Sequence, residues 1–235
     1  MTPSSVRSEV ARLNGTLLQE ELAISVNGSI LKRAGSRVIV TWPSTNGGAL
    51  SDHVFASIQE YRYLLANREY TALLFDGALI QVSYTFEADE FIGHRLCYYP
   101  CPLVLSPDSG IPEFADYFDS QLSSELELQN GLLYATAPID SALSLRLRGP
   151  LRFDYDLRNT AEGHSATHLH IVHEDVRWPI YGPMSIGHFV RLVFRRFYSS
   201  LEIESLREWP LQYVRRTVSP DDEAGLFIEC RHERA

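Results

Sequence analysis

Apolar and polar residues alternate strictly in two short segments near the middle of the chain. In Leu151–Asp156 every second residue is apolar, and the residues between are one arginine and two aspartates. Residues 167–173 repeat the pattern with histidines in the polar positions. Successive side chains of a strand point to opposite faces, so each segment predicts a strand with one apolar and one polar face. Pairing of the two strands would gather on one surface Arg152, Asp154, Asp156, His168 and His170.

A second pair of alternating segments predicts a β-hairpin with an open register. Residues 78–86 and 91–99 are strand-like and are separated by a short turn. A two-residue loop would place His94 beside Ser83 and Gln81, whereas a three-residue loop would place Arg95 there, because a one-residue slip exchanges the faces. Further strands are predicted within or over residues 30–42, 73–75, 143–148, 212–218 and 226–231.

Apolar residues at helical spacing predict four helices. Thr2 can cap the first, with Pro3 at its first position, and Gly15 offers a point for a kink or break at a cost of roughly 1 kcal/mol relative to alanine. The clearest helix spans residues 185–201, where Ser185 is the cap. The other two are predicted over residues 51–67 and 112–128.

The order of these elements predicts an α+β fold. Strands come in runs with helices between the runs, which favours a mainly antiparallel sheet flanked by helices, here those of residues 51–67 and 185–201. There is no internal repeat and no linker that demands a second domain. We therefore predict a single domain over residues 1–235, in which residues 1–50 give an N-terminal helix and strands and residues 51–235 give the main sheet and helices.

Composition and charge narrow the function classes. A hydrophobic content of 45% over 235 residues is that of a folded globular protein. The net charge of −9 argues against a protein that coats nucleic acid, but it leaves room for a local basic patch. Three cysteines give no disulfide framework. Without a signal-peptide core or an apolar run near the ~20 residues that span a bilayer, we expect a cytoplasmic protein that does not bind membranes.

Six stretches, in order across most of the chain, carry a family resemblance: DGALIQ (76–81), GHRLCYYPCP (93–102), RFDYD (152–156), THL (167–169), RWP (177–179) and FVRLVFRRFY (189–198). They resemble a bacterial domain-of-unknown-function family, number 2290, which implies no established activity. The central stretch also faintly resembles small bacterial toxin-like families. The positions that fall in the family-like words are Asp76, Gln81, His94, Arg95, Arg152, Asp154, Asp156, His168 and Arg177.

The chain differs from the family's pattern in two respects. The pattern has a hydroxyl-bearing residue where this chain has His170, and the cysteines at 97 and 101 are incidental to the pattern. Both departures weaken a mechanism that needs a His-x-His pair or a cysteine. No nucleophile elbow, phosphate-cradling glycine loop or dinucleotide fingerprint is present, which lowers the hydrolase, nucleotide-hydrolase and dehydrogenase interpretations.

These residues allow two hypotheses of a metal site. His168 and His170 point the same way on a strand, and Asp154 or Asp156 can add oxygen ligands for a divalent metal. The plainer interpretation is a solvated polar strand that holds no ion. A structural zinc site at His94, Cys97 and Cys101 lacks a second cysteine pair, and buried free cysteines behave as small apolar residues.

Metal-independent phosphoryl chemistry uses the same face differently. His168 would act as general acid or base, Arg152 or Arg177 would clamp a phosphate, and Asp154 would orient the histidine, as in a ribonuclease. An Arg–Asp ion-pair network that only fixes the sheet explains the same residues. Likewise, the arginines at 191, 195 and 196 are either a phosphate-contacting patch or, more simply, a solvated helix face.

The leading interpretation is a nuclease-like effector of toxin or phage-defence type that acts on RNA or DNA without a cofactor, a divalent metal being the lesser option. Its partner would be nucleic acid at a local basic patch. The alternative is a non-catalytic module that binds another protein and whose Arg/Asp/His face is structural. The predicted catalytic residues are Arg152, Asp154, His168 and Arg177, and the predicted substrate-binding residues are Gln81, His94, Arg95 and Asp156.

Overall fold

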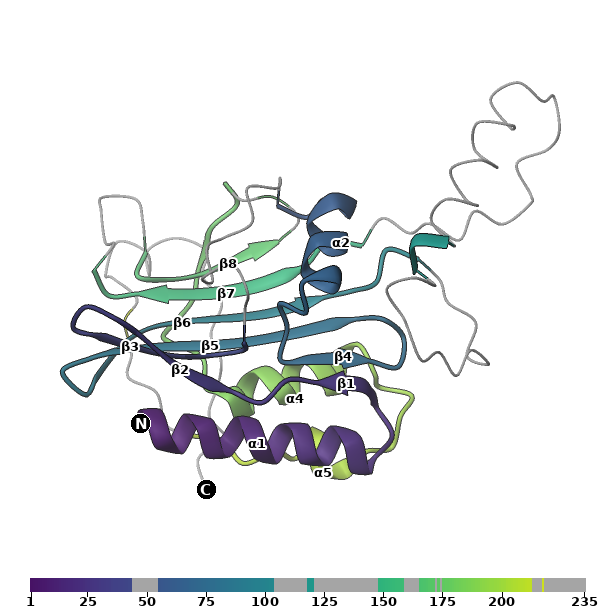
Figure 1. Cartoon of the computed structure of the whole chain (residues 1–235), viewed down its shortest axis with the longest axis horizontal. Coiled ribbons are helices and arrows are strands. Elements are labelled where there is room, and N and C mark those ends of the chain that lie inside the picture. Colours follow the sequence, from purple (N-terminus) through teal and green to yellow (C-terminus); the bar gives the residue numbers. More distant parts are fainter. Residues whose placement is uncertain are drawn as a thin grey trace, which may run out of the picture.

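The structure is a computed structural model that describes residues 1–43, 55–103, 118–120, 148–158, 165–171, 173, 175–212 and 217. Figure 1 shows helices packed against one broad twisted sheet. The elements in chain order are α1 (Pro3–Gln19), β1 (Ala23–Val26), β2 (Ile30–Ala34), β3 (Arg37–Thr41), α2 (Ile58–Ala66), β4 (Ala72–Leu74), β5 (Leu79–Glu87), β6 (Glu90–Tyr99), β7 (Leu151–Asp156), β8 (Thr167–Ile171), β9 (Trp178–Pro179), α4 (Ile186–Arg196) and α5 (Glu204–Arg207).

The sheet is antiparallel at every described pairing. Its strands follow the order β1-β4-β5-β6-β7-β8-β9, and the β2–β3 hairpin joins through β3, which pairs with β5. The predicted α+β class with a mainly antiparallel sheet is therefore confirmed. The N-terminal strands β1, β2 and β3 belong to the same sheet as the later ones.

The two faces of the sheet are covered differently. Helices α1, α4 and α5 pack on one face, where the apolar sides of α1 and α4 meet the inward residues of β5 to β8 in the main core. On the other face, α2 covers one end of the sheet with a smaller cluster around Tyr61 and Tyr99. The rest of that face carries the polar positions of β5 to β8.

The ends of the helices follow their capping residues. Thr2 and Ser5 form a capping box at α1, and the helix continues through Gly15 without a break, so the expected interruption there is wrong. Burial of the apolar stripe of α1 outweighs the small propensity penalty of one glycine. Helix α2 starts at Ile58 behind a Ser57 cap, later than residue 51, because residues 55 and 56 form a turn.

The predicted helix 185–201 begins as expected but is shorter. Ser185 accepts a hydrogen bond from the His188 amide and caps α4, which ends at Arg196. Arg191 and Arg195 do not form an open phosphate patch: their Nε atoms donate to the backbone carbonyls of Trp209 and Arg207, at the end of α5. These two arginines therefore join α4 to α5.

Two glycines give a stability prediction with an internal control. A Cβ on Gly187 would lie 2.1 Å from the Pro210 carbonyl oxygen, whereas one on Gly15 would meet nothing within 4 Å. We expect Gly187→Ala to lower the free energy of unfolding by about 2 kcal/mol, since α4 must move away from backbone. Gly15→Ala should raise it by up to about 1 kcal/mol. Urea unfolding of both variants measures this, and equal small effects would contradict the close approach.

The β5–β6 hairpin resolves the open register in an unexpected way. The loop is two residues, Ala88 and Asp89, both with positive φ, as a type I′ turn requires. A β-bulge then inserts Ile92 into β6, so that Ser83 pairs with Arg95 and not with His94. The two-residue loop thus gives the face that we expected from a three-residue loop.

Several predictions lie wholly or partly outside the described residues. The predicted strands 143–148, 212–218 and 226–231 fall there almost entirely, and of the predicted helix 112–128 only residues 118–120, which are helical, are described. Strand β4 confirms the prediction for 73–75 within one residue. In the described part of the chain, no helix is both long enough and apolar enough to cross a membrane.

Candidate functional site

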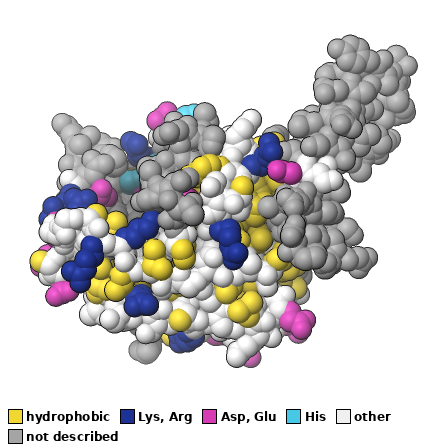
Figure 2. Space-filling model, in the orientation of Figure 1, with side chains coloured by type: hydrophobic (Ala, Val, Ile, Leu, Met, Phe, Trp, Pro, Cys, Tyr) yellow, Lys and Arg dark blue, Asp and Glu magenta, His cyan; other side chains and the backbone are white. Residues whose placement is uncertain are grey.

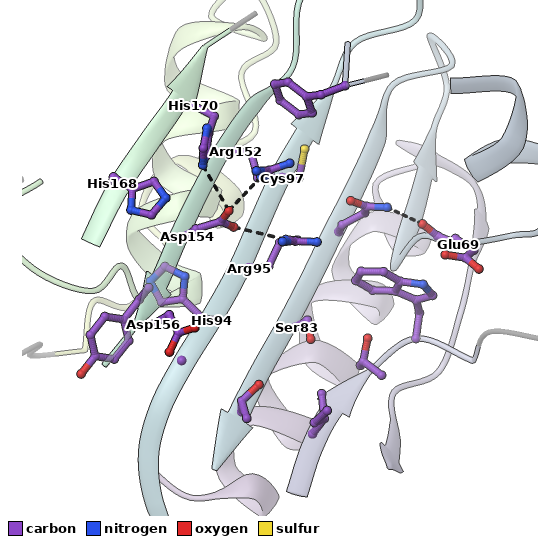
Figure 3. A pocket seen from close by; sticks show the side chains of 18 of the residues that line it. Glu69, Ser83, His94, Arg95, Cys97, Arg152, Asp154, Asp156, His168 and His170 are labelled. Carbon is purple, nitrogen blue, oxygen red and sulfur yellow. Dashed lines mark hydrogen bonds and ion pairs between the residues drawn. The ribbon is translucent and has the colours of Figure 1, made fainter. Parts of the chain in front are cut away.

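A cavity of about 560 Å³ lies on the sheet face opposite α1 and α4. In Figure 3 the viewer looks onto this face, and the helices of the main core lie behind the strands. Register places the polar side chains in two neighbouring rows across the strands. One row, from β5 to β8, is Ser83, Arg95, Asp154 and His168; the other is Gln81, Cys97, Arg152 and His170.

Asp154 is the centre of the polar network. Its Oδ1 accepts from Arg95 Nε at 3.2 Å, and its Oδ2 accepts from Arg152 Nε at 2.9 Å. The Nε2 of His170 lies 3.4 Å from the same Oδ2. Figure 3 shows these three contacts converging on one carboxylate. Both predicted strands therefore do turn their charged and imidazole groups into one hollow.

The charges around Asp154 fix its ionisation. Burial alone would raise the pKa of this carboxyl, but Arg95, the hydrogen bond with His170 and Arg152 together hold the pKa well below its ordinary value. Arg152 is itself held in place, because its guanidinium carbon lies 4.5 Å from the centre of the Phe55 ring. The carboxylate is thus ionised at neutral pH and its arginines are fixed in position.

The two histidines stand side by side with different anchors. The ring centres of His168 and His170 are 4.7 Å apart. The Nδ1 of His168 lies 3.0 Å from the Ser165 carbonyl oxygen, which can only accept, so Nδ1 carries the proton. His170 donates from Nε2 to Asp154, and its buried Nδ1 has no hydrogen-bond partner among the described residues. In the neutral form, the acceptor nitrogen is therefore Nε2 in His168 and Nδ1 in His170.

Asp154, His168 and His170 also have the ligand types of a metal site. One potential ligand atom from each lies within 4.8 Å of the other two. However, the carboxylate is already bonded to two guanidinium groups, and a divalent ion bound there would lie close to both fixed positive charges. The arrangement therefore suits an anion better than a cation.

Two further ionisable groups in the cavity have raised pKa values because they are buried. Burial raises the pKa of the Cys97 thiol to about 12, although Arg152 opposes the shift, so the sulfur is not a thiolate nucleophile at neutral pH. The Glu60 carboxylate accepts from the Ala56 amide and from the Tyr99 hydroxyl, and burial raises its pKa. Glu60 thereby ties α2 to the floor of the cavity.

A comparison with family models shows to which protein family the chain belongs. A family model described as "Uncharacterized conserved protein (DUF2290)" matches residues 22–230, which is most of the sequence. The chain belongs to the DUF2290 family. A search of curated proteins and a search of solved structures gave no match. Because the description of DUF2290 names no activity, its function has to be argued from the cavity.

The other predicted site residues of this DUF2290 chain occupy the cavity unequally. Arg95, Gln81, Asp156 and Arg177 line it, and the last two are exposed. The Gln81 side chain makes a structural contact, since its Nε2 donates a hydrogen bond to the Glu69 backbone carbonyl. Among the family-like words, DGALIQ begins with a residue that does not line the cavity: Asp76 accepts from the Tyr198 hydroxyl instead.

His94 borders the cavity but does not serve it. Its Nδ1 lies 3.2 Å from the Phe153 carbonyl oxygen, and its Nε2 accepts from the Met184 amide, on the core side with Tyr84. Both ring nitrogens are therefore occupied, and burial lowers the pKa of His94 to about 4. These contacts place the His94 imidazole on the core face of the sheet, away from the row of Arg95, Asp154 and His168. The bulge at Ile92 is the cause, because it gives the site face to Arg95.

The DUF2290 cavity also contains residues that the sequence patterns did not single out. Lys32 of β2, Trp42 after β3 and Phe55 before α2 line it. No local pattern marks Lys32 and Trp42, because their place depends on β3 pairing with β5, far along the chain. Figure 2 shows lysines and arginines in separate groups on the face that it presents.

Proposed function

We propose that this protein binds single-stranded RNA in the cavity and cleaves it without a metal. The observation that carries the proposal is that the imidazoles of His168 and His170 lie beside the guanidiniums of Arg95 and Arg152 in one hollow. Imidazoles move protons near neutral pH, and guanidiniums bind phosphate oxygens through their N–H forks. Arg95 and Arg152 each bond Asp154 through Nε, and each guanidinium has further N–H groups on its terminal nitrogens.

RNA is the proposed substrate because its own 2′-hydroxyl can act as the nucleophile. The 2′-hydroxyl loses its proton to one histidine, and its oxygen forms a bond to phosphorus. The bond from phosphorus to the 5′-oxygen breaks, and this oxygen receives a proton from the second histidine, which starts as imidazolium. The products are a 2′,3′-cyclic phosphate and a free 5′-hydroxyl, and the two protons balance.

The residues take the following roles. His168 accepts the proton, and His170, whose Nε2 is held by Asp154, donates one from Nδ1, the ring nitrogen without a partner among the described residues. Arg95 and Arg152 stabilise the charge that develops on the phosphate oxygens, and the exposed Arg177 at the edge of the cavity adds a contact to the strand. Asp154 keeps the two arginines in position and does not touch the reacting atoms.

Incubation of the purified protein with RNA tests this directly. We expect a single-stranded RNA to be cleaved in the presence of EDTA, while DNA and 2′-O-methyl RNA of the same sequence stay intact. His168→Ala should lower the rate by about a hundredfold or more. His173→Ala is the matched control, because this histidine is exposed and does not line the cavity. A melting curve shows that each variant is folded, and His168→Gln serves if the alanine variant is not.

The same assay separates the alternatives. Cleavage that requires Mn²⁺ and stops with EDTA would contradict the metal-independent mechanism and support ligation by Asp154, His168 and His170. No cleavage under any condition would favour a non-catalytic protein-interaction module. One observation supports that second candidate: Asp154 already has three protein donors, as expected of an ion-pair network that only fixes the sheet.

A further inference from the structure

The cavity extends well beyond the histidines, to the β2–β3 hairpin. Lys32 of β2 pairs with Ile39 of β3, which pairs with Thr85 of β5. Thr85 is two residues from Ser83, so this row lies on the same sheet face as Arg95 and His168. Five strand-to-strand steps separate β8 from β2, and at about 4.8 Å a step the two backbones are about 24 Å apart.

Two polar groups near this second end are buried without a partner. Lys32 and Trp42 both line the cavity, and among the described residues neither the Nζ of Lys32 nor the Nε1 of Trp42 has a hydrogen-bond partner. A buried ammonium or N–H without an acceptor is costly, so such groups usually meet an acceptor from a ligand or from water. Both groups are donors, which requires an acceptor-rich ligand.

No described carboxylate supplies these acceptors, because neither the Nζ of Lys32 nor the Nε1 of Trp42 has a hydrogen-bond partner among the described residues, and two carboxylates that line the cavity have other partners. The Asp154 carboxylate is bonded to Arg95, Arg152 and His170, and Glu60 is bonded to Ala56 and Tyr99. The positive charge of Lys32 therefore faces the cavity without a described counter-charge in contact. An anionic oxygen of a ligand would satisfy it.

We infer that Lys32 and Trp42 form a second phosphate-binding subsite, so that the ligand is a single strand of several nucleotides laid across β8 to β2. This inference rests on the proposed function, because the first phosphate sits between the arginines and the histidines. One nucleotide is too short to reach both ends of the cavity. A strand with several phosphates reaches both, and its oxygens satisfy the unpartnered donors.

Binding of uncleavable RNA tests the inference apart from cleavage. The probe is a fluorescent 2′-O-methyl oligoribonucleotide of about eight nucleotides, compared with the dinucleotide of the same chemistry. We expect Lys32→Gln to weaken binding of the longer probe and to lower the slope of log Kd against log salt by about 0.7, the value for one lost phosphate contact on a single strand. Binding of the dinucleotide at the histidine end should not change.

Arg33→Gln is the matched control. It removes the same charge from the next residue of β2, which is exposed and points to the opposite face. Equal effects of the Lys32 and Arg33 substitutions, equal binding of both probes, or no binding of the longer probe would overturn the second subsite. Failure of the proposed function shows differently, as intact RNA in the cleavage assay while the binding results stand.

Discussion

Asp154→Ala is expected to destabilise the protein by about 3 kcal/mol or more, because it leaves two partly buried guanidiniums without their shared counter-charge. Arg95 and Arg152 both bond the carboxylate, whose side chain is only 14% exposed. The loss comes from uncompensated charge and not from lost packing. Chemical denaturation at pH 7 measures it as a lower free energy of unfolding.

Asp156→Ala is the internal control for this result. Asp156 lies on the same strand and the same sheet face as Asp154, but it is exposed, so the substitution should change stability by about 0.5 kcal/mol or less. The pH dependence gives a second check. The pKa of Asp154 is held below its ordinary 3.8, so its stabilisation is present above that pH and is lost as the pH falls further. The gap between wild type and Asp154→Ala should then close in acid.

The second large effect is a loss of stability in mild acid that comes from His94. Burial lowers the pKa of this histidine from 6.5 to about 4. Between these values the unfolded chain binds a proton that the folded protein refuses, so stability falls as the pH drops from 6.5 towards 4. The shift corresponds to about 3 kcal/mol. Its physical basis is desolvation of the ring in the core, where Nε2 accepts from the Met184 amide and so cannot take a proton without losing that bond.

Comparison of two variants isolates this contribution. His94→Gln retains an acceptor that can bond the Met184 amide but cannot titrate, so the variant should lose much less stability than wild type between pH 6.5 and pH 4. His173→Gln, at an exposed position, should follow the wild type. Urea denaturation over this pH range measures all three proteins. Parallel curves for wild type and His94→Gln would show that His94 is not buried as a neutral ring.

Local pattern predicted the fold wherever one strand face is buried. The alternation in Leu151–Asp156 and Thr167–Ile171 gave both strands, their pairing and the convergence of Asp154 with His168 and His170. The pattern could not locate helix starts such as Ile58. More than one serine precedes this helix, and the structure shows that the cap is Ser57, directly after a turn. Such choices depend on tertiary contacts of the flanking chain.

The same distinction holds for the candidate site. Residues on neighbouring strands, such as Arg152 and His170, could be associated from the sequence because short-range pairing brings them together. Lys32 could not, since its place depends on β3 crossing to β5 after a long intervening segment. The sheet face of His94 could not be predicted for a third reason. A bulge has no clear composition signal, and this one exchanged the faces of His94 and Arg95.

The bulge at Ile92 makes the count of residues in this hairpin a functional property. Every side chain of β6 beyond it takes its face from that one additional residue, and so does the choice between an arginine in the hollow and a histidine in the core. The amino acids at 94 and 95 therefore do not by themselves determine which side chain enters the cavity, because the number of residues before them also matters. In an alignment of relatives, a gap of a single position between the turn and residue 94 would signal a reorganised binding surface even where every polar residue is retained.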